Sequence, residues 1–179
     1  MIEVVLVAAI AENGVIGRAG GLPWRIKSEM RRFRAMTWGK PVVVGRKTYL
    51  SFAKRPLPGR TNVIVSRSGD FAAPGAIVAT TLATALEAAR GDALRRASDA
   101  IMVLGGAEIY AQAMPLADRL EITHIHAQPA GDTVFPAIDP AVWREAARTI
   151  HPPEAGDDAG YDAVTYVRFR AASALCDPA

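Results

Sequence analysis

Short runs of hydrophobic residues alternate along this chain with segments in which apolar side chains recur at helical spacing. A run that is apolar throughout is typical of a strand covered on both faces, because each face then packs against nonpolar side chains. Runs of this kind predict strands at residues 4–9, 41–44, 62–66, 76–79, 100–104 and 119–126. The periodic segments predict helices at residues 26–36, near 47–52, at 82–90 and at 107–113. Such alternation indicates an α/β fold with a mainly parallel central sheet flanked by helices on both faces.

The last quarter of the chain has a different pattern. Residues 143–150 and 163–170 alternate between apolar and polar types, as an antiparallel pair of strands with one face in water does. Between them, residues 152–160 are rich in Pro, Gly and Asp and predict a loop. We therefore expect the sheet to end in an antiparallel C-terminal strand.

Local signals place a helix boundary and a candidate lid. Thr80 and Thr81 are expected to cap the helix at 82–90, and Gly91 is expected to end it. The long connection at residues 11–23 mixes four glycines, which free the backbone, with apolar side chains that a closing loop could bury. We interpret this connection as a mobile lid over a ligand; an ordinary surface loop is the alternative.

One carboxylate, Glu29, falls on the apolar side of the predicted helix at 26–36. With Ile26 as the origin and about 100° per residue, Glu29 lies near 300°, beside Phe33 near 340°. The wet side, at roughly 100–240°, holds Lys27, Ser28, Arg31 and Arg32. Burying an ionised carboxylate is energetically unfavourable. A Glu on an apolar face therefore extends to solvent at the edge of that face, pairs with an Arg, or takes part in a chemical reaction. The remaining motifs favour chemistry.

Three junctions that follow predicted strands are suited to phosphate groups. After residues 41–44 come Gly45, two cations (Arg46 and Lys47) and the hydroxyl of Thr48. Leu104-Gly105-Gly106 leaves the backbone open to a ligand, and Ser66-Arg67 adds another hydroxyl and cation. Ligands of open α/β sheets bind beyond the carboxyl ends of strands, where N–H groups at helix starts favour anions. Three such junctions in one chain predict a large polyanionic cofactor.

Length and charge restrict the function classes. The 179 residues suit a single domain (1–179), with a frayed tail at about 171–179. A net charge of +3 without a dense Lys/Arg run argues against a nucleic-acid partner, and the apolar N-terminus predicts a buried strand, not a signal or membrane segment. His124 and His126 lack further ligands, so no metal is expected. The lone Cys176 fits a cytoplasmic location, and we expect a monomer.

Taken together, the motifs resemble those of dihydrofolate reductase over roughly residues 2–170. The resemblance is carried, in collinear order, by Val15-Ile-Gly17, Leu22-Pro-Trp24, Glu29 with Phe33, Gly45-Arg-Lys-Thr48, Arg55-Pro-Leu-Pro-Gly-Arg60, Gly105-Gly106 through Tyr110, Thr123-His-Ile and Gly131-Asp-Thr-Val-Phe-Pro136. It implies NADPH-dependent reduction of 7,8-dihydrofolate to 5,6,7,8-tetrahydrofolate, within one-carbon metabolism. It also implies antifolate inhibitors as small-molecule partners.

The resemblance further implies roles for individual residues. Glu29 would bind the amino-pyrimidine edge of the pterin and assist its protonation, and Thr123 would support that carboxylate. Trp24 would order a nearby water, and Leu22 would lie above the reaction centre. The implied substrate site comprises Val7, Ala9, Glu29, Met30, Phe33, Phe52, Leu57, Arg60, Leu104 and Thr123. The implied cofactor site comprises Ala9, Ile16, Gly45, Arg46, Lys47, Thr48, Ser66, Arg67, Leu104, Gly105, Gly106, Ala107, Glu108, Ile109 and Tyr110, the last also assigned to catalysis.

Three features depart from the family's pattern, and two alternatives stay open. Bacterial members usually carry Asp at the position of Glu29, and the extra methylene moves the carboxylate by roughly 1.5 Å. The turn at residues 52–55 is one residue longer than in many bacterial members, and the tail beyond Arg170 has no evident counterpart. The alternatives are a pyrimidine reductase of the riboflavin pathway and a non-catalytic nucleotide- or RNA-binding module.

Overall fold

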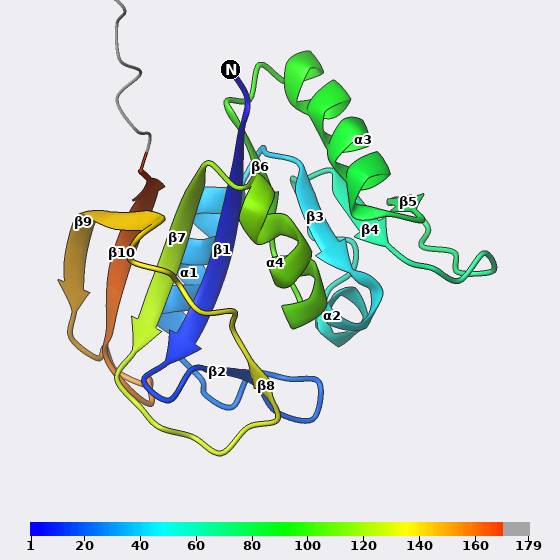
Figure 1. The fold of residues 1–179 in the computed structure, drawn as a ribbon. Coiled ribbons are helices and arrows are strands. Elements are labelled where there is room, and N and C mark those ends of the chain that lie inside the picture. Colours follow the sequence, from blue (N-terminus) through cyan, green and yellow to red (C-terminus); the bar gives the residue numbers. More distant parts are fainter. Residues whose placement is uncertain (170–179) are drawn as a thin grey trace, which may run out of the picture.

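A computed structural model describes residues 1–169 of the chain, and its centre is an eight-stranded sheet (Figure 1). The strand order is β5-β4-β3-β6-β1-β7-β10-β9. The strands are β1 (Glu3–Ala11), β3 (Val42–Gly45), β4 (Asn62–Val65), β5 (Ile77–Ala79), β6 (Ala100–Val103), β7 (Arg119–Ile125), β9 (Trp143–His151) and β10 (Tyr161–Arg168). Neighbours from β5 to β7 pair in parallel, whereas β10 is antiparallel to both β7 and β9. The predicted sheet is confirmed. Arg170, Cys176 and the expected tail lie outside the described residues.

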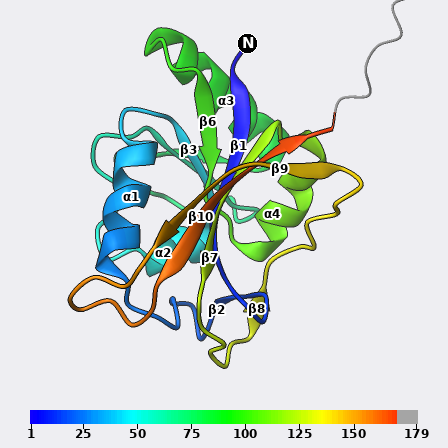
Figure 2. The same cartoon turned by 90° about the vertical axis from the view of Figure 1, so that its left-hand side faces the viewer.

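Within residues 1–169, four helices cover the two faces of this sheet (Figure 2). They are α1 (Lys27–Thr37), α2 (Arg46–Ser51), α3 (Leu82–Arg95) and α4 (Ala107–Ala113), which continues into a 3-10 turn at Met114–Leu116. Val4 and Leu6 of β1 pack with α3 and α4, whereas Val5 and Val7 point to the opposite face, against residues of α1 and α2. None of the helices in the described part is long and apolar enough to cross a membrane.

Helix α3 corrects one sequence prediction. Thr81 caps its N-terminus in a reciprocal arrangement with Thr84, but the helix does not end at Gly91 and continues to Arg95. Asp92, which is only 4% exposed, accepts hydrogen bonds from Arg95 and Arg96, each at 2.8 Å. These contacts stabilise a further turn, and the chain leaves the helix at Ala97, whose φ is 52°. A glycine tolerated inside a helix is indistinguishable in sequence from one that ends it.

The N-terminus of α1 is capped by a distant loop. Its N-cap residue, Ile26, makes no side-chain cap hydrogen bond. Instead, Asp157 in the loop between β9 and β10 accepts from the Lys27 N–H at 2.6 Å and from the Ser28 hydroxyl. The hydrogen bond from Ser28 lowers the pKa of Asp157. The predicted loop at residues 152–160 is confirmed, and it fixes the start of the helix that carries Glu29.

The connection at residues 11–23 contains a short strand that the sequence did not predict. This strand, β2 (Val15–Gly17), pairs antiparallel with β8 (Thr133–Val134), on the loop after β7. A Cβ atom at Gly131 would lie 2.2 Å from Val15 Cγ1 and 2.7 Å from the Gly17 carbonyl oxygen. Only glycine permits this approach. The candidate lid is therefore held against a second loop by main-chain hydrogen bonds.

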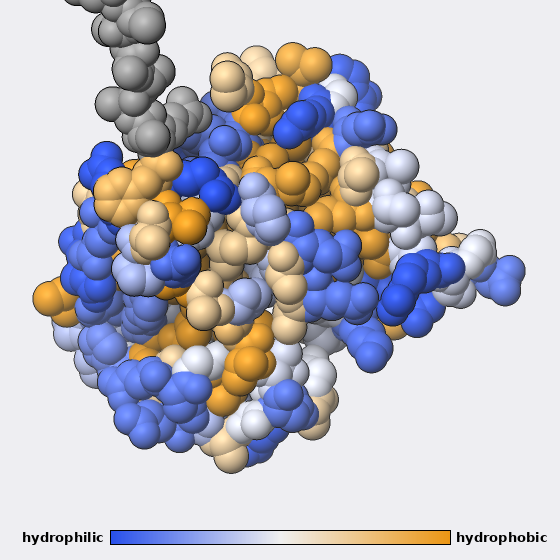
Figure 3. All heavy atoms as spheres, in the orientation of Figure 1, coloured by the Kyte–Doolittle hydropathy of each residue, from blue (hydrophilic) through white to orange (hydrophobic). Residues whose placement is uncertain are grey.

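The outermost strand, β9, differs from the expected pattern of one wet face. Residues 144–150 are exposed on both faces, although the predicted antiparallel pairing with β10 is confirmed. Arg144, Glu145 and Arg148 place charges along this edge, and Figure 3 shows a predominantly hydrophilic surface there. Charged edge strands resist pairing with other chains. Residues 144–150 are exposed on both faces because β9 is the last strand of the sheet and no element within residues 1–169 covers it.

We expect Gly91→Ala to stabilise the protein by about 1 kcal/mol, because alanine favours a helix interior over glycine. A Cβ atom at Gly91 meets nothing within 4 Å, and Gly91 is not among the glycines with positive φ. Urea unfolding measures the change. Gly14→Ala is the matched control: the space around Gly14 is equally open, but its φ of +82° disfavours alanine, so this variant should be destabilised. Equal effects of the two substitutions would contradict the helical assignment of Gly91.

Candidate active site

A cleft of about 1670 Å³ opens at the carboxyl ends of the central parallel strands. Val7 and Ala9 of β1, Gly45 of β3 and Leu104 just after β6 line it, together with residues of α1, α2 and α4. This is where open α/β sheets bind ligands. The volume exceeds the roughly 300–1,000 Å³ of a pocket for one drug-sized molecule. The cleft therefore has room for more than one drug-sized molecule.

The structure brings the predicted site residues together. Those that line the cleft are Val7, Ala9, Ile16, Leu22, Glu29, Met30, Phe33, Gly45, Arg46, Lys47, Thr48, Phe52, Leu57, Arg60, Ser66, Arg67, Leu104, Gly106, Ala107, Glu108, Ile109 and Tyr110. Three others lie beside it. Trp24 lines an adjoining hollow of about 420 Å³ that shares Glu29 with the cleft, Thr123 lies behind Glu29, and the carbonyl of Gly105 accepts the Gly45 N–H at 2.7 Å.

Glu29 is a buried carboxylate at the floor of the cleft. The residue is 6% exposed, and the Thr123 hydroxyl donates a hydrogen bond to its Oε1 at 3.3 Å. Burial raises the pKa of Glu29, while the hydrogen bond from Thr123 and the charge of Arg32 oppose that rise. Thr123 is positioned by β7, where it lies opposite Ala9 of β1. A carboxyl group in this setting can exchange a proton nearer to neutral pH than a solvated one.

The buried face of α1 is rotated relative to the helical-wheel prediction. Glu29 is buried as predicted, but Met30 is 49% exposed at the cleft, and Ser28 is 8% exposed although it was assigned to the wet side. Arg32 was also assigned to the wet side, yet its side chain is 23% exposed and contacts Glu121 and Thr123 on β7. Partners from distant segments turn these polar residues inward. A wheel built on apolar positions cannot register such partners.

The Tyr110 side chain is fixed by contacts with Val7 and Gly105. Its hydroxyl donates to the carbonyl of Val7 at 2.6 Å, and burial raises its pKa far above neutral. Its ring packs so closely on Gly105 that a Cβ atom there would lie 2.5 Å from Tyr110 Cε2; Gly105 also has a φ of +93°. Only glycine fits this turn. The hydroxyl is thus a neutral donor that fixes the Gly105 turn against β1.

The anion-binding junctions lie around one end of the cleft. Neither α2 nor α4 has a side chain that caps its N-terminus, and a Cβ atom at Gly106 would lie 2.8 Å from Thr48 Oγ1. Arg46 lies over the Phe71 ring, 5.9 Å from its centroid. Arg67 is exposed and pairs with Glu108 at 3.5 Å. Backbone N–H groups, hydroxyls and cations therefore face a shared space, a donor set that suits phosphates.

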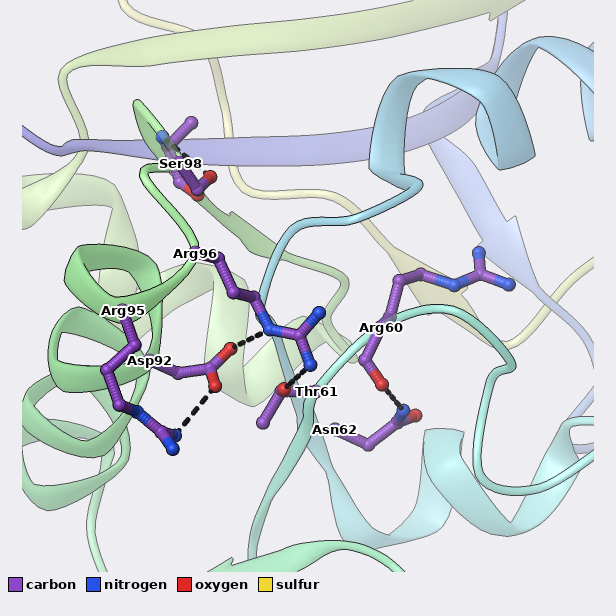
Figure 4. Close-up of polar contacts among 8 residues, drawn as sticks. Arg60, Thr61, Asn62, Asp92, Arg95, Arg96 and Ser98 are labelled. Atoms are coloured by element: carbon purple, nitrogen blue, oxygen red, sulfur yellow. Dashed lines mark hydrogen bonds and ion pairs between the residues drawn. The ribbon is translucent and has the colours of Figure 1, made fainter.

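A turn anchored by the buried Asn62 presents Arg60 at the other end of the cleft. Asn62, 1% exposed, donates to the carbonyl of Arg60 at 3.0 Å, and its Oδ1 accepts the Leu57 N–H at 2.9 Å. The next residue, Thr61, accepts from Arg96, while the Arg60 side chain extends toward α1 (Figure 4). There it donates to Thr37 Oγ1 at 2.9 Å. The turn thus holds both Leu57 and Arg60 toward the ligand space.

Two parts of the cleft were missed from the sequence. Arg34 stands beside Arg60, and both guanidinium groups lie over the Trp38 ring, at 5.0 Å and 5.9 Å from its centroid. Burial and the Arg34 charge lower the pKa of Arg60. Thr80 and Thr81 also line the cleft, beyond the end of β5. The strand-end rule applied to the other junctions would have found these threonines.

The comparisons with known proteins agree with this geometry. The dihydrofolate reductase family profile matches residues 3–168. A dihydrofolate reductase of Neisseria meningitidis is 46% identical over 149 residues, covering 83% of this chain and 88% of the relative. The type 3 dihydrofolate reductase of Salmonella typhimurium is 43% identical over 165 residues, covering 92% and 98%. A structure of Enterococcus faecalis dihydrofolate reductase, complexed with NADP(H) and RAB-propyl, gives a TM-score of 0.82 at 29% identity, covering 94% and 97%.

The matched region includes nearly all of the described residues, with the sheet, the cleft and the carboxylate on α1. The chain therefore belongs to the dihydrofolate reductase family.

Proposed function

We propose that this chain reduces 7,8-dihydrofolate to 5,6,7,8-tetrahydrofolate, with Glu29 assisting protonation of the pterin. NADPH-dependent dihydrofolate reduction is the reaction of its family, so the chain is an oxidoreductase of one-carbon metabolism. The observation that carries the role of Glu29 is its burial, at 6% exposure, beside apolar walls. The family match favours this reaction over a riboflavin-pathway pyrimidine reductase or a non-catalytic binding module.

Glu29 would bind and orient the substrate as well as assist its protonation. A carboxylate can accept two hydrogen bonds from the amino-pyrimidine edge of the pterin. Because burial raises its pKa, Glu29 can take up a proton nearer to neutral pH than a solvated carboxyl group and return it through the pocket. The indole Nε1 of Trp24 is buried with no hydrogen-bond partner among the described residues, which leaves it able to orient a water beside the carboxylate.

The end of the cleft that Gly45, Arg46 and Gly106 line fits NADPH, which supplies the hydride when bound. The turn at Gly105 and Gly106 opens the backbone to the pyrophosphate, with Thr48 beside it. Arg46, Lys47, Ser66 and Arg67 would hold the adenosine end and its 2′-phosphate, and Ala9 and Ile16 would border the nicotinamide. Ser66 is buried and its hydroxyl already accepts the Ser68 N–H at 3.3 Å, so the arginines supply most of the attraction.

Arg60 would receive the glutamate carboxylate of the substrate. A planar guanidinium matches a carboxylate with two parallel hydrogen bonds. Arg34 adds a second cation nearby, and a bound anion would relieve the repulsion between the two. Antifolates with a diaminopyrimidine ring would pair with Glu29 in the same cleft. The cytoplasmic location, the monomeric state and the single-domain organisation remain part of this proposal.

Glu29→Gln should reduce turnover at neutral pH by about 10²–10⁴-fold, the usual contribution of general acid catalysis. The variant keeps the size of the side chain but removes its charge and titratable proton. Acidification should restore part of the rate, because solvent then supplies protonated substrate. Stopped-flow NADPH oxidation measures the rate, and fluorescence titration should show unchanged NADPH binding. Turnover like that of the unmutated chain near pH 7 would remove Glu29 from the chemistry.

The same substitution should increase stability at neutral pH. The pKa of Glu29 is raised in the folded state, so ionisation disfavours folding: stability present below the unfolded pKa is lost as pH rises through the folded pKa. The uncharged amide of the Glu29→Gln variant has no such loss. Urea unfolding of both proteins at pH 5 and pH 8 should show a larger gain at pH 8. Lower stability of the variant at pH 8 would mean that its lost activity reflects structure.

Arg67→Ala should weaken the preference for NADPH over NADH by about tenfold, because a charged hydrogen bond to the 2′-phosphate is lost. The measurement is kcat/KM with each cofactor. Glu108→Gln is the paired variant: it frees Arg67 from its ion pair and should strengthen the preference. Equal efficiency of the unmutated chain with both cofactors would contradict the assignment of Arg67.

If residues 14–22 form a lid, bound NADPH with a folate analogue should protect their amides from hydrogen exchange. In the free protein, amides of β2 should already be partly protected by pairing with β8. The amides of Gly20 and Leu22 should gain the most protection when the ligands bind. Amides of α3 serve as the internal control, since most of that helix lies away from the cleft. Unchanged exchange at Leu22 would identify the segment as an ordinary surface loop.

A further inference from the structure

Arg32 occupies a position between Glu29 and the neighbouring strand β7. Its Nη1 donates to Thr123 Oγ1 at 3.2 Å, and its Nη2 lies 3.5 Å from Glu121 Oε2. Glu121 and Thr123 are two residues apart on one strand, so their side chains share a face. The guanidinium therefore bridges the two, with 23% of its side chain exposed. The two contacts place a cation directly behind the proposed catalytic carboxylate.

The contact with Arg32 determines which way the Thr123 hydroxyl points. A hydroxyl has one hydrogen to donate and two lone pairs to accept with. Arg32 carries only donors, so Thr123 must accept from it. The single Thr123 hydrogen is directed to Glu29 Oε1 at 3.3 Å, its one hydrogen-bond acceptor within the described residues. Oε1 thus faces a donor, and the other oxygen, Oε2, is the better site for a proton.

The charges around this chain of contacts come from several elements. Glu121 balances Arg32 and also accepts from Thr165 of β10 at 3.0 Å, while Arg119 lies 3.4 Å from its other oxygen. Tyr110 of α4 is a neutral phenol, because burial and the charge of Glu29 both raise its pKa. Arg32 is the cation that acts on Glu29 through space, and it opposes the effect of burial.

We propose that Arg32 is a positioning residue that orients the Thr123 hydroxyl as a permanent donor to Glu29. This favours the ionised form of the carboxylate and directs the proton it takes up to the oxygen away from Thr123. The inference rests on the proposed role of Glu29 and adds to it a residue that does not touch the substrate. A purely structural Arg32, which only joins α1 to β7, would affect stability and leave the titration of Glu29 unchanged.

The test compares Arg32→Met and Arg32→Lys in the full chain by two measurements. The first is the pH profile of single-turnover hydride transfer from NADPH to dihydrofolate. The second is infrared difference spectroscopy of the protonated carboxyl band of Glu29, identified by its absence in Glu29→Gln. Arg32→Met should raise the pH at which both signals fall by about one unit, because a neighbouring cation typically shifts a carboxyl pKa by 1–3 units. Arg32→Lys, which keeps the charge, should shift it less.

Two controls separate this inference from its alternatives. Arg31→Met removes a cation from the same helix; its guanidinium pairs with Glu154, away from Thr123, so both profiles should stay in place. In a Thr123→Val background, Arg32→Met should shift the profiles less than in the unmutated chain, because part of its effect passes through the hydroxyl.

An unmoved carboxyl band in both Arg32 variants, or additive effects of the Arg32 and Thr123 changes, would overturn the role of Arg32. Failure of the proposed function gives a different result: Glu29→Gln would retain the activity and its pH step. If Arg32→Met does not fold, Arg32→Lys still tests the proposal. Lysine lacks the planar guanidinium that contacts Thr123 and Glu121 together, so the pH at which the Glu29 carboxyl band falls should rise. No change in that pH in Arg32→Lys would count against the proposal.

Discussion

The pairing of β1 with β6 on one side and β7 on the other is the constraint on which the site depends. β1 is apolar on both faces, and Val4, Val5 and Leu6 are fully buried. Its register sets Ala9 opposite Thr123, so the Thr123 side chain is presented where α1 delivers Glu29. A slip of one residue would turn every side chain of a strand to the other face. The hydrogen bond between Thr123 and Glu29 would then be lost, together with the floor of the cleft.

Burial of the Glu29 carboxylate disfavours folding, although the proposed reaction requires a carboxylate at this position. Burial disfavours the charged form of Glu29, and only one of its oxygens, Oε1, has a hydrogen-bond partner within the described part of the chain. A fold optimised for stability alone would place an apolar residue there. The cleft keeps the carboxylate and surrounds it with Thr123, Arg32 and, one step further, Glu121. These partners reduce the energetic cost of the buried carboxylate without neutralising it, as its proposed role in proton exchange requires.

Much of the fold could be predicted from the sequence because the apolar runs and the strand-end motifs are local signals. Residues 107–113 form a helix with the predicted bounds, and the junctions predicted to bind phosphates gather at one cleft. The sequence predictions that failed concern residues whose partners are remote in sequence. Ser28 is buried because its hydroxyl donates to Asp157. Helix α3 continues beyond Gly91 because Arg95 and Arg96 donate to Asp92. The pairing of β2 with β8 needs the close approach at Gly131, which no periodicity reveals.

Other partners remote in sequence hold the candidate lid at residues 14–22 in place. On one side of Leu22, the Ala19 N–H is held by Asp132 Oδ2 at 2.8 Å, and Arg18 and Gly21 exchange backbone hydrogen bonds. On the other side, the Arg25 N–H is held by Asp158 Oδ2 at 2.7 Å. Leu22 lies between these anchors and is 53% exposed at the cleft. Because both anchors are carboxylates from loops at the same end of the sheet, they hold the segment beside the space that Leu22 and Glu29 both line. The position of Leu22 over the cleft is thus a consequence of how the loops around β1 are tied together.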